Sequence, residues 1–176
     1  MVKYIAFLRG INVGGQNKIA MSELKAAFEK QGFQKVTTYI NSGNIVFESE
    51  LSESEVKTVC EALIEKTFSL KIVVCIITTA ELADALAHAP KWWNKTADAK
   101  NNAVFVIPPV TAAEICAEIN DTKPEYEKIS FYGKVIFWTA PLASFSKTRL
   151  TKIVHKKEHS GITVRNANTT LKLSEF

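Results

Sequence analysis

The order of strand and helix patterns is the feature that most constrains the fold of this chain. In the first half, apolar residues recur at helical spacing from Met21 to Phe28 and from Val56 to Phe68. Strand patterns flank these helices at residues 4–8, 36–41, 44–49 and 71–77. The order is β-α-β-β-α-β, which is the split βαβ plan of ferredoxin-like domains.

Short signals mark where these elements begin and end. Ser52 and Glu55 have the spacing of a capping box, which predicts a helix start immediately after Ser52. Gly32 stands where the C-terminal cap of the preceding helix is expected. Ser42-Gly43 predicts a tight turn between two strands, so the residues around it should form a hairpin.

The same order is read again in the second half. A strand is expected at 103–107, a helix after the capping box that begins at Thr111, and a hairpin around Tyr132-Gly133. A helix over 144–157 and a strand at 162–165 complete the series. We therefore predict an α+β fold of two ferredoxin-like (βαββαβ) halves with antiparallel sheets, packed as one unit. The N-terminal half covers 1–78, a bridging helix and connection 79–102, and the C-terminal half 103–176.

The cysteine pattern and the short apolar runs predict a cytoplasmic protein. The three cysteines lie in apolar patterns, without metal-ligand spacing, which is typical of reduced, buried thiols: Cys60, Cys75 and Cys116. Arg9 interrupts the first apolar run, so a signal peptide is not expected, and no run approaches the length of a membrane span. We expect no cofactor, no membrane contact, and a monomer or weak homodimer.

Positive charge is concentrated near the C-terminus. The net charge is +4, yet residues 147–172 alone hold seven basic residues and one acidic residue. Arg149, Lys152 and Lys156 would form a stripe on one face of the expected helix. Such a stripe either contacts an anionic partner, a small molecule or nucleic acid, or is simply solvated.

The loop that follows the first strand is the candidate binding site. Residues 9–18 are long for a connection and include several glycines, whose backbone N–H groups can surround an anion. The loop lacks the lysine of a Walker loop and the spacing of a dinucleotide fingerprint. Its predicted ligand-binding residues are Arg9, Asn12, Gly14, Gly15 and Lys18. The alternative is a structural turn with Arg9 in a surface ion pair.

Other patterns leave the function class open. His155, Glu158 and His159 match the inverted zincin pattern, but no third ligand is evident, so no metal site is predicted. Phe47 follows a glycine as in RNA-recognition sheets, although the motif is incomplete and a core position is the alternative. No activated nucleophile or carboxylate pair is recognisable, so the sequence alone does not decide whether the chain is an enzyme.

Three segments resemble one family. They are Leu8–Gly15, Tyr39–Phe47 and Thr163–Thr169. These residues resemble the bacterial family called domain of unknown function 1697. The resemblance implies a duplicated ferredoxin-like fold but supplies no activity, substrate or catalytic residue.

The family segments extend the candidate site beyond the loop. They add four residues to the predicted ligand-binding set: Asn44, Arg165, Asn166 and Asn168. Alternatively, Asn168 or Thr169 caps a short terminal helix and Arg165 pairs with an acid. We predict a module that binds an anionic ligand (nucleotide, phosphate-containing metabolite or nucleic acid) at the loop 9–18. The alternatives are a small-molecule enzyme with an unrecognised pocket and an RNA-binding sheet surface.

Overall fold

The computed structural model describes residues 1–119, 122–154 and 161–176. The chain divides into two compact units, Met1–Ala80 with Phe176, and Glu81–Glu175.

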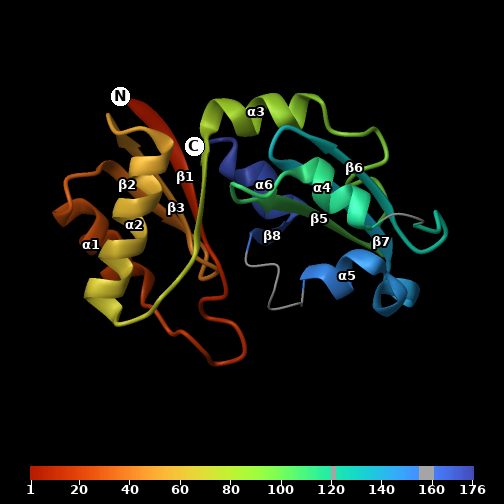
Figure 1. Ribbon diagram of the computed structural model, residues 1–176, viewed down its shortest axis with the longest axis horizontal. Coiled ribbons are helices and arrows are strands. Elements are labelled where there is room, and N and C mark those ends of the chain that lie inside the picture. The colour runs from red at the N-terminus through yellow and green to blue at the C-terminus, as the bar shows by residue number, and fades with distance from the viewer. Residues whose placement is uncertain (120–121, 155–160) are drawn as a thin grey trace. The chain divides into compact units, whose positions relative to one another are not determined.

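The N-terminal unit is a four-stranded antiparallel sheet with two helices on one face (Figure 1). Its strands are ordered β2-β3-β1-β4. The elements are β1 (Val2–Leu8), α1 (Met21–Lys30), β2 (Gln34–Tyr39), β3 (Asn44–Ser49), α2 (Glu53–Phe68) and β4 (Val74–Thr78). This is the predicted ferredoxin-like order.

Buried apolar side chains at alternate positions of β1 point to one face of the sheet, and α1 and α2 cover that face. Tyr4, Ala6 and Leu8 alternate along β1 and belong to the same buried cluster as Leu24 of α1 and Cys60 of α2. The helix start predicted at Ser52 is confirmed, since Ser52 and Glu55 form both bonds of a capping box. These hydrogen bonds hold the pKa of the Glu55 carboxyl below its usual value.

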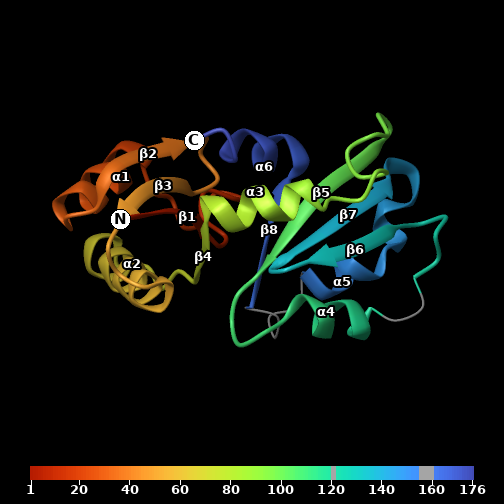
Figure 2. The ribbon, with the colours of Figure 1, turned by 90° about the horizontal axis from the view of Figure 1, so that it is seen from above.

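The C-terminal unit repeats the plan, with strand order β6-β7-β5-β8. Figure 2 shows α4 and α5 on the same side of this sheet. Its elements are α3 (Thr79–Ala87), which begins at the end of the first unit, β5 (Ala99–Val106), α4 (Ala112–Glu118), β6 (Lys128–Tyr132), β7 (Val135–Pro141), the 3-10 helix η1 (Leu142–Lys147), α5 (Arg149–Val154), β8 (Ile162–Asn166) and α6 (Ala167–Leu173). The prediction of two ferredoxin-like halves with antiparallel sheets is therefore confirmed.

The predicted continuous helix over 144–157 is wrong. Its first part is the 3-10 helix η1, and Thr148 is extended, with φ −66° and ψ 144°. α5 then starts anew, because the buried carboxylate of Glu127 accepts hydrogen bonds from the backbone N–H groups of Arg149 (2.6 Å) and Leu150 (3.3 Å). A carboxylate at a helix N-terminus satisfies donors that have no partner within the helix.

The strand predicted at 103–107 begins earlier than expected. β5 starts at Ala99, so Lys100, Asn101 and Asn102 are strand residues rather than part of a polar connection. Asn101 explains part of this extension, since its amide donates to the backbone oxygen of Thr96 and accepts from the hydroxyl of Thr139 on β7. The extension places Lys100 and Asn102 on the sheet face that also carries Trp138 of β7.

Candidate functional site

The candidate site is a pocket in the C-terminal unit, on the sheet face covered by α4 and α5. Its volume is about 930 Å³. It is lined by residues 94–97 and 99–102, by Trp138, Phe145, Thr151 and Val154, and by Val164 and 166–168. A volume of this size is within the range of small-molecule and cofactor sites.

The register of three strands places the floor of this pocket. Trp138 of β7, Asn102 of β5 and Asn166 of β8 lie directly opposite one another across neighbouring strands. Side chains at such positions share a face and are about 5 Å apart from strand to strand. Two residues further along β5 on the same face, the row is apolar, since Val104 pairs with Ile136 and Val164. The pocket therefore lies where the sheet face changes from core to polar surface.

An aromatic pair forms one wall. Trp138 and Phe145 are stacked, with ring centroids 5.2 Å apart and an angle of 30° between planes. Trp138 is buried, whereas Phe145 is half-buried. The Lys100 ammonium lies 3.9 Å from the centre of the Phe145 ring, a cation–π contact. The Trp138 indole N–H is buried and makes no hydrogen bond with the part of the chain that is described.

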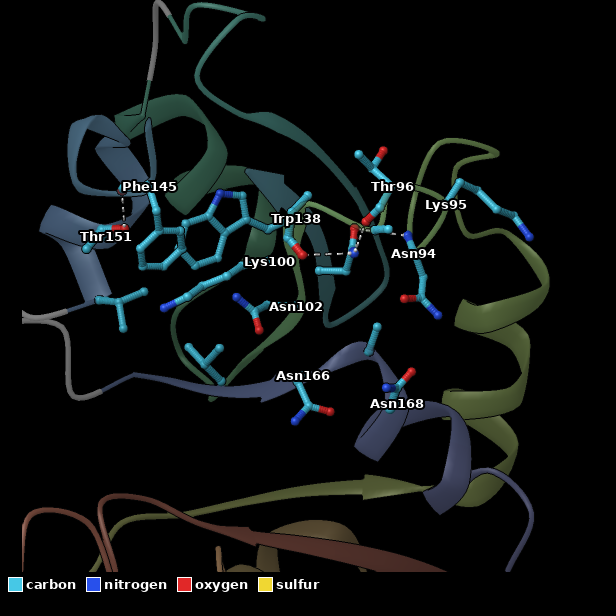
Figure 3. A pocket seen from close by; sticks show the side chains of 16 residues that line it. Asn94, Lys95, Thr96, Lys100, Asn102, Trp138, Phe145, Thr151, Asn166 and Asn168 are labelled. Atoms are coloured by element: carbon cyan, nitrogen blue, oxygen red, sulfur yellow. Dashed lines mark hydrogen bonds between the residues drawn. The ribbon is translucent and has the colours of Figure 1, made fainter. Parts of the chain in front are cut away.

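Asparagine side chains form the opposite walls. Figure 3 shows Lys100 and Asn102 between the aromatic pair and Asn166 with Asn168. The Asn166 side-chain oxygen caps α6 by accepting from the Thr169 backbone N–H at 2.7 Å. Its amide nitrogen and the Asn102 and Asn168 amides have no hydrogen-bond partner among the residues described, so these groups are available to a ligand.

The lining carries positive charge only. Lys95 and Lys100 are exposed, and none of the 16 lining residues, all in the described part of the chain, is Asp or Glu. The same residues include no histidine or cysteine. The two ammonium groups give the lining a net positive charge, which attracts anions.

The glycine-rich loop 9–18 is held by its own side chains. The Asn12 amide donates to the backbone oxygens of Ile19 (2.9 Å) and Asn41 (2.8 Å), and its oxygen accepts from the Ile19 N–H. Gly14 and Gly15 form the tip with φ of 59° and 77°, values that favour glycine. Asn12 thus braces the loop, and both of its amide hydrogens are already used.

For the other loop residues of the predicted set, ligand binding stays a prediction. Lys18, Gly14 and Gly15 are exposed and Arg9 is half-buried. The loop belongs to the N-terminal unit, whereas the pocket residues belong to the C-terminal unit.

Two further residues of the predicted set, Asn44 and Arg165, are buried and make hydrogen bonds within the protein. Asn44 is fully buried, and its amide donates to the Tyr39 backbone oxygen and the Ser42 hydroxyl, both at 3.0 Å. Arg165 is buried, and it donates to the Thr163 hydroxyl and the Val164 carbonyl. Arg165 alternates with Asn166 along β8, so it lies on the sheet face opposite to the pocket. Of the predicted set, only Asn166 and Asn168 line the pocket.

The other patterns have structural explanations or fall outside the described residues. Phe47 is fully buried and packs within 4.5–6.1 Å, centroid to centroid, of Tyr4, Phe28 and Phe33, so it cannot stack an RNA base. The zincin-like residues 155–159 and Lys156 of the basic stripe lie outside the described residues.

The cysteines and helices of the described chain add no site. Cys60 and Cys75 are buried, whereas Cys116 is half-buried, and burial raises the pKa of the Cys116 thiol to about 11. Within the described residues no group of three metal-ligating side chains is found, and no helix has the length and apolar content needed to cross a bilayer.

Sequence reasoning missed most of the pocket: Asn94, Lys95, Thr96, Lys100, Asn102, Trp138 and Phe145. The available signal was the polar run at 94–102 directly before a buried strand, together with an aromatic at 138 on the neighbouring hairpin.

Comparison with known proteins agrees with the fold. The conserved bacterial protein SP0830 from Streptococcus pneumoniae has a structure similar to this chain, with a TM-score of 0.85 and 28% sequence identity over 99% of this chain and 97% of that one. No curated protein matches. The family model described as protein of unknown function (DUF1697) matches residues 1–137, most of the chain. The chain therefore belongs to the DUF1697 family.

Proposed function

We propose that this protein binds a small anionic ligand in the pocket of the C-terminal unit. The observation that carries the proposal is the combination of two lysines, no acidic residue among the described lining, and an aromatic wall. A ligand phosphate or carboxylate would replace the ring of Phe145 as the partner of Lys100. This exchange is favourable because a charge-assisted hydrogen bond contributes more than a cation–π contact at an exposed site.

The described lining contains no histidine, cysteine or carboxylate side chain, which favours binding over turnover. Thr96 and Thr151 supply hydroxyl groups, but neither has a histidine or carboxylate beside it among the lining residues described. The enzyme alternative therefore has less support than a binding module. Nucleic acid is a weaker candidate ligand, since Trp138 is buried and Phe145 is half-buried, so neither ring is displayed on an open sheet face.

Thermal shift measurements with AMP, citrate and ribose 5-phosphate test the proposal. At least one of these anions should raise the melting temperature of the wild type, since ligand binding to the folded state stabilises it. Lys100→Gln should weaken that binding at least about tenfold. Lys128→Gln is the matched control, because Lys128 is exposed on β6 of the same sheet and pairs with Thr139, which lies on the face opposite to Trp138. Equal effects of the two variants would contradict the proposal.

The glycine loop 9–18 is the second candidate site for the same class of ligand. Its support is a fixed loop whose glycine tip and Lys18 are exposed. Arg9→Ala separates the two sites: it should leave anion binding unchanged if the pocket is the site and abolish it if the loop is the site.

A further inference from the structure

The pocket lining combines an aromatic pair, side-chain amides and a lysine. Together these groups specify the ligand more narrowly than the charge alone. Resting on the proposed function, we infer that the pocket takes a nucleoside monophosphate. The base packs against Phe145 and meets the asparagine side chains, and the phosphate is bound by Lys100.

The aromatic wall fits a flat ring. Phe145 is half-buried, and the buried Trp138 stacks behind it and fixes its orientation. Val154 and Val164, both half-buried, add apolar surface to the same cavity. Stacking of a base on an aromatic side chain contributes about 1–3 kcal/mol and tolerates any base. A phosphate or carboxylate without a ring would leave this wall unused.

The amide groups fit the edge of a base. Asn102 and Asn168 each offer a donor and an acceptor, and Asn166 offers its NH₂ group while its oxygen caps α6. Asn102 lies between Trp138 and Asn166 in the strand register, so an amide lies directly beside the aromatic wall. Base edges present alternating donors and acceptors, which asparagine side chains can match in pairs.

Lys100 is placed where the charge of such a ligand would be. Its ammonium is 3.9 Å from the Phe145 ring centre, at the border between the apolar wall and the amides. A ring stacked on Phe145 would displace the ammonium to the ring's periphery. In a nucleoside monophosphate the phosphate is attached through the sugar, a few bonds from the ring, which is within reach of a flexible lysine side chain.

Calorimetric titration of the full chain with AMP, UMP, adenosine and ribose 5-phosphate tests this inference. Both nucleotides should bind at least about tenfold more tightly than ribose 5-phosphate, which has the anion without the base. Adenosine, the base without the anion, should also bind more weakly than AMP. Phe145→Leu should reduce AMP affinity at least about tenfold without changing ribose 5-phosphate binding, while Phe145→Tyr restores AMP affinity.

Phe131→Leu is the matched control, because Phe131 is an exposed aromatic on β6 that does not line the pocket. Asn102→Ala should weaken AMP but not ribose 5-phosphate, and melting temperatures show that each variant is folded. Equal affinity for AMP and ribose 5-phosphate would overturn the nucleotide inference and leave the anion proposal intact. If AMP, UMP and ribose 5-phosphate all fail to bind while citrate binds through Lys100, the nucleotide inference is again overturned. No binding of any anion would overturn both.

Discussion

At the scale of single residues, Asn12 shows how one side chain can fix a loop. It has a positive φ of 54°, and its amide makes three hydrogen bonds to the backbone of Ile19 and Asn41. Asparagine tolerates the left-handed region better than most residues, because its short polar side chain can bond locally. Asn12 therefore stabilises the loop both by its conformation and by its contacts.

Asn12→Ala should lower the free energy of unfolding by about 1–3 kcal/mol, because it leaves backbone groups without partners. Urea denaturation followed by circular dichroism would measure this. Asn17→Ala is the control with a smaller expected effect, since Asn17 makes a single exposed side-chain bond to Gly10. Unchanged stability together with weaker anion binding in Asn12→Ala would show instead that Asn12 contacts a ligand.

At the scale of elements, the two hairpin turns differ in how closely their glycines are packed. Both Gly43 (φ 77°) and Gly133 (φ 55°) are in the left-handed region. A Cβ on Gly43 would lie 2.7 Å from the Ile11 side chain and 2.8 Å from Leu8, whereas a Cβ on Gly133 would meet nothing within 4 Å. The turn at Gly43 therefore also packs against the start of the glycine-rich loop.

Gly43→Ala should lower the free energy of unfolding by about 2–4 kcal/mol, since backbone strain and overpacking add. Gly133→Ala should lower it by only about 1–2 kcal/mol, because strain acts alone. Chemical denaturation of the two variants beside the wild type measures the difference. Equal losses would contradict the packing explanation for Gly43.

The elements predicted correctly from the sequence are those whose signals lie between residues close together in the chain. The capping boxes at Ser52 and Thr111 are both observed, as is the strand predicted at Asn44–Ser49. The break at Thr148 was not predictable, because the cap of α5 comes from Glu127, which is distant in sequence. The early start of β5 was missed because Lys100 and Asn102 face a pocket, so the strand lacks the apolar alternation by which a strand is recognised.

The candidate site was less predictable than the fold for the same reason. Asn166 and Asn168 were predicted from family segments, but the side chains around them come from β5, β7 and η1. Their convergence depends on strand register, which pairs Asn102 with Trp138 on one side and Asn166 on the other. Sequence distance conceals such a row until the sheet order is known.

At the scale of the whole molecule, the two units share a plan but differ in what they add to it. The N-terminal unit has a long glycine-rich loop after its first strand, whereas the C-terminal unit has a polar extension at the start of β5 and a pocket beside α5. The two copies thus keep the same strand order, while the proposed anion pocket belongs to the C-terminal copy. We propose that the ligand binds in this pocket.

NMR titration of ¹⁵N-labelled protein with AMP, and separately with ribose 5-phosphate, distinguishes this pocket from the glycine-rich loop. We expect saturable chemical shift changes in the backbone and side-chain amides of residues 94–102 and 166–168, and at Trp138 and Phe145. Changes confined to residues 9–18 would contradict this expectation and place the anion site in the glycine-rich loop.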